Sequence, residues 1–269
     1  MKIAIAGASG RMGHILIDAV LAASDLTLTA ALDRDDSPVL GNDAAAFMGR
    51  HSGVQITAQA TQALTDADVL IDFSRPPASL HYLSLCQQSG VKMVIGTTGF
   101  SAQERQLIAD AARTIAIVHA ANMSPGVNIA LFLIEQATRM LADTDIEVIE
   151  AHHRHKVDAP SGTALAIGET IARQLGRPLG EIGVFAREGH TGPRQPGSIG
   201  FSTIRGGDIV GDHTVLFAGQ GEQIEIRHRA TSREHYADGS LRACRFLADK
   251  TQGLYDMRAV LGLPDSRQP

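Results

Sequence analysis

The first 120 residues alternate between short apolar runs and stretches with helical periodicity, and this alternation limits the possible folds more than any other feature of the chain. Apolar residues that recur every three to four positions, such as Leu16, Ala19 and Val20, predict a helix, whereas KIAIA at residues 2–6 predicts a buried strand. Strands and helices that alternate in this way form βαβ units, in which a parallel sheet is covered by helices on both faces. The predicted strands are residues 2–6, 26–32, 68–73, 92–95 and 115–119, and the predicted helices are residues 11–23, 76–89 and 101–113.

The second half of the chain has a different pattern. A long amphipathic helix is predicted after residue 126, and a strand and a second helix follow it. Between residues 181 and 230 the chain is rich in glycine and in strand-like runs, and Gly219-Gln220-Gly221 predicts a hairpin turn. The predicted helices are residues 127–141, 161–175, 237–250 and 257–261, and the predicted strands are residues 146–151, 198–205, 212–219 and 222–230. An α/β half is therefore expected to precede an α+β half.

Three glycines, Gly7, Gly10 and Gly13, stand between the first predicted strand and the first predicted helix. Glycine lets the backbone turn tightly and approach a pyrophosphate, and the N-terminus of the helix offers N–H groups and the positive end of the helix dipole. The spacing is G-x-x-G-x-x-G rather than the usual G-x-G-x-x-G, but the strand before it and the helix after it are in the required places. We interpret the segment as the dinucleotide-binding turn of a Rossmann-type, doubly wound sheet; a tight turn without a ligand is the alternative.

Three further segments support a dinucleotide site. Asp33 ends the second predicted strand, where an acidic residue accepts hydrogen bonds from the adenosine ribose. Arg34 follows it, and a guanidinium there can bind the 2′-phosphate of NADPH, so both NADH and NADPH are candidate cofactors. Gly96–Gly99 and Ala120–Met123 follow two later strands and are expected to border the nicotinamide, because ligands of open α/β sheets bind beyond the carboxyl ends of the strands. The alternatives are a solvated charged loop and ordinary βα loops.

Five basic side chains in a row, His152 to Lys156, follow a predicted strand and precede a helix that begins near Ser161. A substrate carboxylate can bind the N–H groups at the start of that helix, and the nearby basic groups can bind a dianion and supply a proton. On an extended strand His152 and Lys156 would lie about 13 Å apart, so the loop must bend if both serve one reacting atom. A zinc site at HHxH lacks an obvious set of further ligands, and a solvated basic face is the plainer alternative.

Composition and the two cysteines exclude several classes of protein. Lys and Arg number 24 against 29 Asp and Glu, a net charge of −5 that disfavours non-specific binding to nucleic acid. An apolar content of 44% is enough to bury a core, and no apolar run approaches the roughly 18–20 residues that span a bilayer. Cys86 and Cys244 lie far apart and outside any CxxC motif, which fits a reducing compartment. We therefore expect a cytoplasmic protein.

Seven segments of the chain resemble segments of the dihydrodipicolinate reductase family and follow one another in the same order as in that family. The resemblance covers essentially the whole sequence. The most specific of them is EAHHRHKVDAPSGT at Glu150–Thr163. The other six are GASGRMG (7–13), IDFSRP (71–76), VIGTTGF (94–100), AANMSPGVN (120–128), REGHTGPR (187–194) and GDIVGDHTV (207–215).

The resemblance implies an activity and a set of site residues. The implied reaction is the reduction of 4-hydroxy-tetrahydrodipicolinate in lysine and diaminopimelate synthesis: the substrate loses water and accepts a hydride from NADH or NADPH at C4. The family pattern makes His152 and Lys156 the proton-transferring residues and places the substrate carboxylate on His153, Gly162 and Thr163. It places no metal. The cofactor-binding residues it implies are Gly7, Ala8, Ser9, Gly10, Arg11, Met12, Asp33, Arg34, Gly96, Thr97, Thr98, Ala120, Ala121, Asn122 and Met123.

The resemblance also implies how the chain is divided. A dinucleotide-binding domain is expected at residues 1–124 plus 235–269, and a substrate-binding and tetramerisation domain with a mixed sheet at residues 125–234. The implied partners are a small dicarboxylate and three further copies of the chain, with neither nucleic acid nor membrane. Met123 stands where some members have Phe, which affects the fit at the nicotinamide end. Asp33 stands where some members have Glu, and its shorter side chain leaves the preference between NADH and NADPH open.

Two other functions compete with this interpretation. A regulator that senses NAD(H) would keep the glycine turn and Asp33 but would not need the segment from His152 to Thr163. A dehydrogenase on the same two-domain plan would act on another small substrate; an aldehyde dehydrogenase of that kind needs a catalytic cysteine, and neither cysteine here has a neighbouring base in the sequence. The basic segment is the feature that separates these functions from a reductase.

Overall fold

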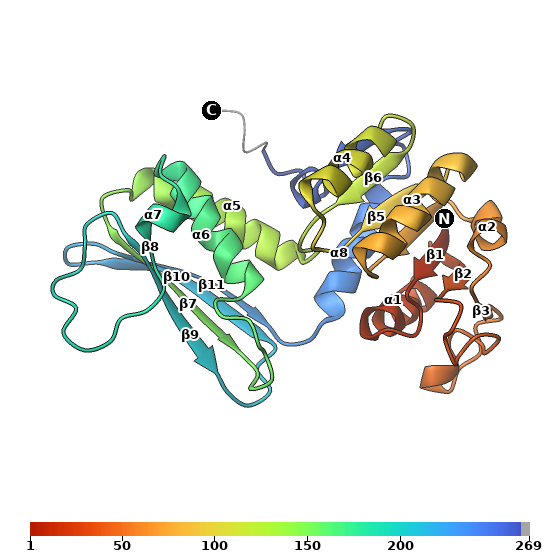
Figure 1. Ribbon diagram of the computed structural model, residues 1–269, viewed down its shortest axis with the longest axis horizontal. Helices are drawn as coiled ribbons and strands as arrows, with labels where there is room; N and C mark the ends of the chain where they lie inside the picture. Colours follow the sequence, from red (N-terminus) through yellow and green to blue (C-terminus); the bar gives the residue numbers. More distant parts are fainter. Residues whose placement is uncertain (265–269) are drawn as a thin grey trace. The chain divides into compact units, whose positions relative to one another are not determined.

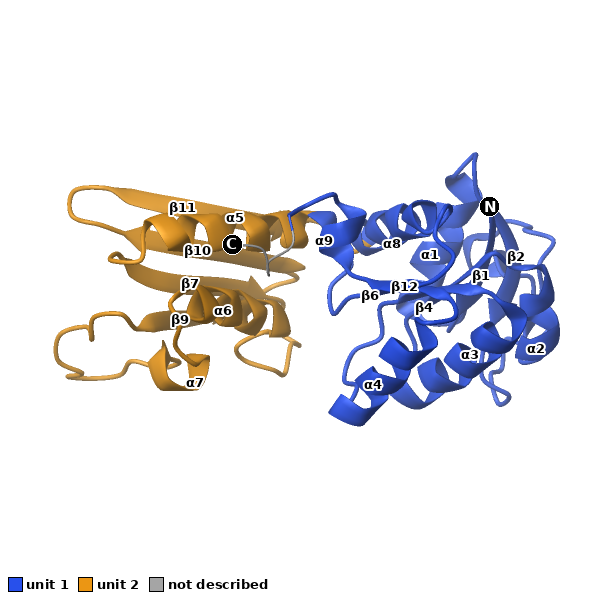
Figure 2. Ribbon diagram, turned by 90° about the horizontal axis from the view of Figure 1, so that it is seen from above, with its two compact units in different colours: residues 1–125, 234–269 blue, residues 126–233 orange. Residues whose placement is uncertain are grey.

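The computed structural model describes residues 1–264; the last five residues of the predicted dinucleotide-binding domain, 265–269, lie outside the described part. The chain forms two compact units, coloured separately in Figure 2. Unit 1 contains residues 1–125 and the chain from residue 234 onward, and unit 2 contains residues 126–233. Unit 2 is thus inserted into the sequence of unit 1.

Unit 1 is built on a seven-stranded sheet in the order β12-β6-β5-β4-β1-β2-β3, and every strand pair in it is parallel. Strands β1, β2, β3, β5 and β6 of this sheet are labelled in Figure 1. The strand order runs in opposite directions from β1 and from β4, which is the arrangement of a doubly wound sheet and confirms the predicted Rossmann-type fold. The strands are β1 (Lys2–Ala6), β2 (Thr27–Leu32), β3 (Ile56–Thr57), β4 (Val69–Asp72), β5 (Lys92–Ile95), β6 (Ala116–His119) and β12 (Gly253–Tyr255).

Helices cover both faces of this sheet, so alternate residues of each strand enter two different cores. Ile3 and Ile5 of β1 pack with Leu16 of the first helix, whereas Ala4 and Ala6 enter the cluster on the other face. The helices are α1 (Arg11–Ala22), α2 (Ala60–Ala63), α3 (Pro76–Ser89), α4 (Ala102–Ala111), α8 (Glu234–Phe246) and α9 (Met257–Val260), with 3₁₀ turns at Ala46–Met48 and Leu64–Asp66. α1 and α8 contribute to the first core, and α3 and α4 to the second.

Unit 2 is a five-stranded mixed sheet in the order β11-β10-β7-β9-β8. β7 lies parallel to β9 and antiparallel to β10, so the predicted mixed sheet is confirmed. Val148, Val215 and Phe217 point to one face and pack with residues of α5 and α6 in a single core. The elements are α5 (Pro125–Met140), β7 (Asp145–His152), α6 (Gly162–Gln174), α7 (Leu179–Ile182), β8 (Gly183–Val184), β9 (Ile199–Arg205), β10 (Gly211–Ala218) and β11 (Gln223–Ala230).

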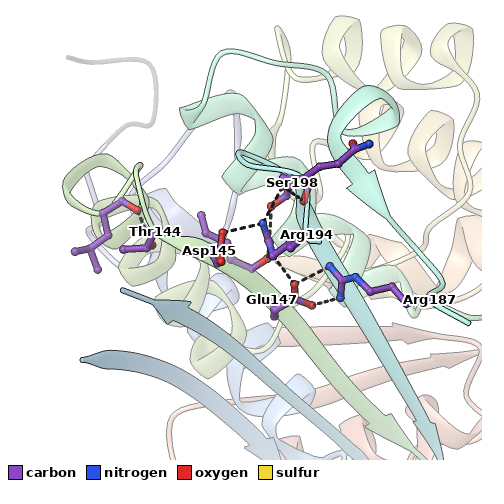
Figure 3. Close-up of polar contacts among 9 residues, drawn as sticks. Thr144, Asp145, Glu147, Arg187, Arg194 and Ser198 are labelled. Carbon is purple, nitrogen blue, oxygen red and sulfur yellow. Dashed lines mark hydrogen bonds and ion pairs between the residues drawn. The ribbon is translucent and has the colours of Figure 1, made fainter. Parts of the chain in front are cut away.

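The long loop between β8 and β9 is fastened to β7 by the carboxylates of Asp145 and Glu147, as Figure 3 shows. Glu147 of β7 accepts two hydrogen bonds from Arg187 at 2.8 Å each and one from Arg194 at 3.1 Å. Gly200 lies opposite Glu147 in the parallel ladder, and a Cβ there would lie 2.0 Å from the Glu147 carboxylate. The glycine therefore leaves the space that the carboxylate occupies.

Most predicted elements are confirmed, and the differences have simple physical causes. Ser101 and Glu104 form the predicted capping box, and Gly219 N–H donates to the carbonyl of Glu222 in the predicted hairpin turn. The three-residue strand β12 was not predicted, because so short a run carries no periodicity. No helix among residues 1–264 is long and apolar enough to cross a membrane.

Candidate active site

The glycine turn of unit 1 has the geometry of an anion-binding site. Gly7 has φ of +71°, and the N–H of Gly10 donates to the carbonyl of Gly7 at 2.9 Å. A Cβ at Gly13 would lie 2.1 Å from that same carbonyl, so only glycine allows α1 to begin this close to the turn. The N-cap of α1, Gly10, provides no side-chain hydrogen bond, and the first turn holds no acidic residue. The positive end of α1 is therefore available to a phosphate, which fits a dinucleotide.

Asp33 lies beside this turn, at the carboxyl end of β2, and is almost fully buried. Its carboxylate accepts hydrogen bonds from the N–H groups of Ser9 at 2.8 Å and Arg34 at 2.9 Å. The Ser9 bond joins the predicted ribose-binding residue to the predicted pyrophosphate turn. Arg34 is largely exposed, and its Nε lies 2.8 Å from the carboxylate of Asp36. The Arg34 guanidinium, which is predicted to bind the 2′-phosphate of NADPH, is thus paired with an acidic neighbour.

A buried carboxylate organises the ends of β4 and β5. Asp72, fully buried at the end of β4, accepts hydrogen bonds from the hydroxyls of Ser79 and Thr97. Thr97 in turn accepts a hydrogen bond from the N–H of Ser74 at 2.9 Å. Burial raises the pKa of the Asp72 carboxyl, an effect that its hydrogen bonds to Ser74, Ser79 and Thr97 oppose. The predicted nicotinamide-side loop is therefore fixed to the neighbouring loop through Asp72.

The other residues predicted on the nicotinamide side differ in exposure. Gly96 packs against Phe73, whose ring a Cβ at Gly96 would meet at 2.3 Å, and Thr98 is exposed. After β6, Ala121 is exposed, and Asn122 accepts a hydrogen bond from the N–H of Ser124 at 2.9 Å. Met123 is 1% exposed and belongs to the core that α8 helps to form. Of this group, Thr98 and Ala121 have the most accessible side chains.

The basic segment of unit 2 begins with a histidine held by a buried carboxylate. His152, the last residue of β7, lies with its Nδ1 2.6 Å from Oε2 of Glu150. Glu150 is 1% exposed, and Arg205 of β9 donates to both of its carboxylate oxygens at 2.8 and 2.9 Å. Since Nδ1 is held by Glu150, Nε2 is the nitrogen of His152 that can exchange a proton with a ligand.

The chain turns shortly after His152, at the place where a bend was predicted. The N–H of Lys156 donates to the carbonyl of His153 at 3.1 Å, which closes a tight turn. Lys156 Nζ lies 2.8 Å from the carboxylate of Asp158, and its side chain is 21% exposed. The extended arrangement that would separate His152 and Lys156 by about 13 Å is therefore not formed.

The N-terminus of α6 follows this loop. Ser161 is the N-cap, and its hydroxyl accepts a hydrogen bond from the N–H of Ala164 at 3.2 Å. Gly162 and Thr163 are the first two residues of α6, and its first turn holds no acidic side chain. His153, predicted beside them, has a pKa below its usual value because of desolvation and of the positive charge of Arg233. The segment thus brings cationic groups and a helix N-terminus into one short stretch, which suits a carboxylate.

Several residues of this site were not found from the sequence. Glu150 stood inside the most specific segment but was given no role, and Arg205 and His213 are separated from it by more than 50 residues. His213 of β10 is buried, its Nε2 lies 3.1 Å from the Ser161 hydroxyl, and its ring meets that of His152 edge-on at 5.1 Å. The alternation of apolar and polar residues along β7 and β10 could have predicted that these side chains share one face of the sheet. It could not have predicted the register that sets them opposite one another. Among residues 1–264 no group of three or more His, Cys, Asp and Glu side chains is placed to hold a metal ion.

A Rossmann-type unit joined to a mixed-sheet unit in which a buried carboxylate orients a histidine is the plan of a two-domain nicotinamide-dependent oxidoreductase. The family model for dihydrodipicolinate reductase, N-terminus, matches residues 1–123, and that for dihydrodipicolinate reductase, C-terminus, matches residues 126–261. The chain therefore belongs to the dihydrodipicolinate reductase family.

Individual relatives agree with this assignment. The 4-hydroxy-tetrahydrodipicolinate reductase of Herminiimonas arsenicoxydans is 60% identical over 264 residues, which cover 98% of each chain. That of Cupriavidus metallidurans is 59% identical and covers 98% of this chain and 100% of its own. A solved structure, the dipicolinate-bound dihydrodipicolinate reductase from Paenisporosarcina sp. TG-14, has a TM-score of 0.76 and 25% identity, covering 96% of this chain and 98% of that one. An amine dehydrogenase from Mycobacterium smegmatis, at 12% identity and a TM-score of 0.62, shares the fold alone.

Proposed function

We propose that this protein catalyses the NAD(P)H-dependent reduction of 4-hydroxy-tetrahydrodipicolinate to tetrahydrodipicolinate in lysine and diaminopimelate synthesis. The observation that carries the proposal is the arrangement of His152, the turn to Lys156 and the start of α6, within a chain that belongs to this reductase family over both of its units. Dipicolinate, the ligand named for the solved relative, is a cyclic dicarboxylate of the class that this arrangement suits. A regulator that only senses NAD(H) has no use for these groups.

Unit 1 supplies the cofactor site in this proposal. The turn from Gly7 to Met12 holds the pyrophosphate at the N-terminus of α1, and Asp33 accepts hydrogen bonds from the ribose. Arg34 binds the 2′-phosphate when the cofactor is NADPH. Gly96–Thr98 and Ala120–Met123 border the nicotinamide. The bound cofactor supplies the hydride, and the protein orients it.

Unit 2 supplies the substrate site and the protons. The N–H groups of Gly162 and Thr163 and the ring of His153 bind a carboxylate of the dianion. Hydride addition to a conjugated imine leaves electron density that a positioned acid must neutralise. His152 presents Nε2 for this purpose because Glu150 holds Nδ1, and Lys156 provides a second ammonium donor.

A homotetramer is part of the same proposal. The sheet of unit 2 has one face covered by α5 and α6, while Ile149, Leu216 and Ile204 lie on the other face and outside that core. Ile204 is 51% exposed, which a symmetric interface between copies would explain. Light scattering of the purified protein tests this, with Leu216→Glu expected to yield a smaller species.

We also propose a cytoplasmic location, since Cys86 and Cys244 are free and buried rather than paired.

Coupled turnover tests the reaction. The substrate is generated in place from pyruvate and aspartate semialdehyde by the synthase that precedes this reductase, and oxidation of NADH or NADPH is followed at about 340 nm. Oxidation that requires every component supports the reductase, and the ratio of the two rates gives the cofactor preference. No oxidation with either cofactor, from folded protein that binds NADH, would favour the regulator or another substrate.

A further inference from the structure

We propose that Glu150 is the positioning residue of this site: it fixes the ring of His152 and, through a second hydrogen bond, the N-terminus of α6, and so sets the proton donor relative to the carboxylate-binding N–H groups. The inference rests on the proposed function, since it assigns a role to a residue that does not touch the substrate.

Glu150 is fully enclosed by its own partners. Its Oε2 lies 2.6 Å from Nδ1 of His152, and its Oε1 accepts a hydrogen bond from the N–H of Ser161 at 3.1 Å. Arg205 spans both oxygens. With 1% of the residue exposed, the carboxylate has no role as a surface charge, and each of its bonds leads to a part of the site. The Ser161 bond is the one that joins β7 to the start of α6.

The same contact decides which nitrogen of His152 is reactive. An ionised carboxylate only accepts hydrogen bonds, so Nδ1 carries the proton in the Glu150–His152 pair. Gly211 of β10 lies on the Nε2 side, and a Cβ there would come within 3.1 Å of Nε2. The absence of that side chain keeps the second nitrogen accessible. Glu150 and Gly211 therefore act from opposite sides of the ring to leave Nε2 as the nitrogen that exchanges a proton.

Arg205 extends this arrangement to the second proton donor. Besides the carboxylate of Glu150, it donates to the backbone carbonyl of Asp158 at 2.6 Å. The carboxylate of Asp158 lies 2.8 Å from Lys156 Nζ. The position of Lys156 thus depends on Arg205, whose guanidinium is in turn held by Glu150.

The charges around the pair agree with a positioning role. Burial alone would raise the pKa of the Glu150 carboxyl, but hydrogen bonds from Arg205, His152 and Ser161 lower it below its usual value, so the carboxylate stays ionised. The titratable and charged groups that face His152 are Glu150 on its own strand, the neighbouring His153, Arg205 on β9 and His213 on β10. Burial lowers the pKa of His213 to about 4, so at neutral pH it adds no competing charge.

The test compares Glu150→Gln with Glu147→Gln. Both residues lie on β7, and each is paired with an arginine that spans its carboxylate, but Glu147 only fastens the loop between β8 and β9 (Figure 3). Glutamine keeps the shape of the side chain and removes the charge that favours the protonated ring. For Glu150→Gln we expect kcat/KM to fall about 10- to 100-fold, as for other residues that orient a reactive group, and the high-pH limb of its pH profile to move about 1 pH unit lower. Binding of NADH stays unchanged, and Glu147→Gln keeps the wild-type profile.

Two further measurements keep the inference separate from the proposed function. In protein labelled with ¹³C-histidine, the titration midpoint of the His152 ring is read by NMR without any turnover, and it moves to lower pH in Glu150→Gln but not in Glu147→Gln. Arg205→Gln, a second variant, is expected to weaken inhibition by dipicolinate, because it loosens the hold on Glu150 and Asp158. An unchanged midpoint and pH limb in Glu150→Gln would overturn the inference even in an active enzyme. A shifted midpoint in a protein that does not reduce the substrate would uphold it while removing the proposed reaction.

Discussion

The burial of His213 predicts a specific loss of stability in mild acid. His213 lies on β10 at 6% exposure, and burial lowers its pKa from 6.5 to about 4. The folded protein therefore holds this ring neutral, whereas the unfolded chain protonates it below about pH 6.5. Above pH 6.5 the ring is neutral in both states, and its burial costs no protonation free energy. As the pH falls from 6.5 toward 4, the unfolded chain binds a proton that the folded protein does not, and the free energy of unfolding decreases.

The size of the effect follows from the two pKa values. A difference of roughly 2.5 units, at about 1.4 kcal/mol per unit, gives a total of about 3 kcal/mol. Between pH 7.5 and pH 4.5 most of that range is crossed, so we expect His213 to account for about 2 to 3 kcal/mol of lost unfolding free energy. This is a large share of the roughly 5–15 kcal/mol that holds a typical domain folded.

Urea unfolding followed by far-UV circular dichroism measures the effect, since the chain has no tryptophan. The wild-type protein is compared with His213→Gln, whose amide can still donate to the Ser161 hydroxyl, and with His190→Gln at an exposed position. Carboxylates that titrate over the same range affect all three proteins equally and cancel in the comparison. The wild type and His190→Gln should lose about 2 to 3 kcal/mol more than His213→Gln. Equal losses in all three would refute the reasoning.

Four further variants, with Gly180→Ala as a control, test the candidate site. Gly13→Ala, whose Cβ would overlap the carbonyl of Gly7, should weaken NADH binding at least about tenfold by fluorescence titration, whereas Gly180→Ala, which meets no neighbour, should not. Arg34→Ala should raise the KM for NADPH about tenfold and spare NADH, and Asp36→Asn should lower the KM for NADPH by freeing Arg34; equal effects on both cofactors would make Arg34 structural. Lys156→Ala should lower kcat by about 10²–10⁴ without changing the Kd for NADH, and an unchanged kcat would remove Lys156 from the mechanism.

Unit 1 was largely predictable because buried parallel strands are continuous apolar runs. VLID at Val69–Asp72 and KMVI at Lys92–Ile95 can be read without knowledge of their neighbours. β12 could not be predicted in this way, since Gly253–Tyr255 becomes a strand only by pairing with β6. Its formation depends on a contact that local sequence does not encode.

The candidate site was predictable where its residues are neighbours in the sequence. His152 to Thr163 form one segment, and a bend between His152 and Lys156 was predicted on the condition that both residues serve one reacting atom. Arg205 and His213 reach the same place through the register of β9 and β10 against β7. Strand register depends on packing across the sheet, so Arg205, the partner of Glu150 from β9, could be identified only from the structure.

The insertion of unit 2 between β6 and α8 fixes an order of assembly during synthesis. When the ribosome has made residues 1–125, the edge of β6 that β12 later pairs with is open, and α8 is missing from its core. All of unit 2 is then translated before Glu234–Phe246 and Gly253–Tyr255 emerge to close that core and that edge. Unit 2 is contiguous in the sequence and has its own core, so it can fold as it leaves the ribosome. The unit that begins first is thus the one that is finished last, and nascent chains stalled before residue 253 carry an unprotected strand edge.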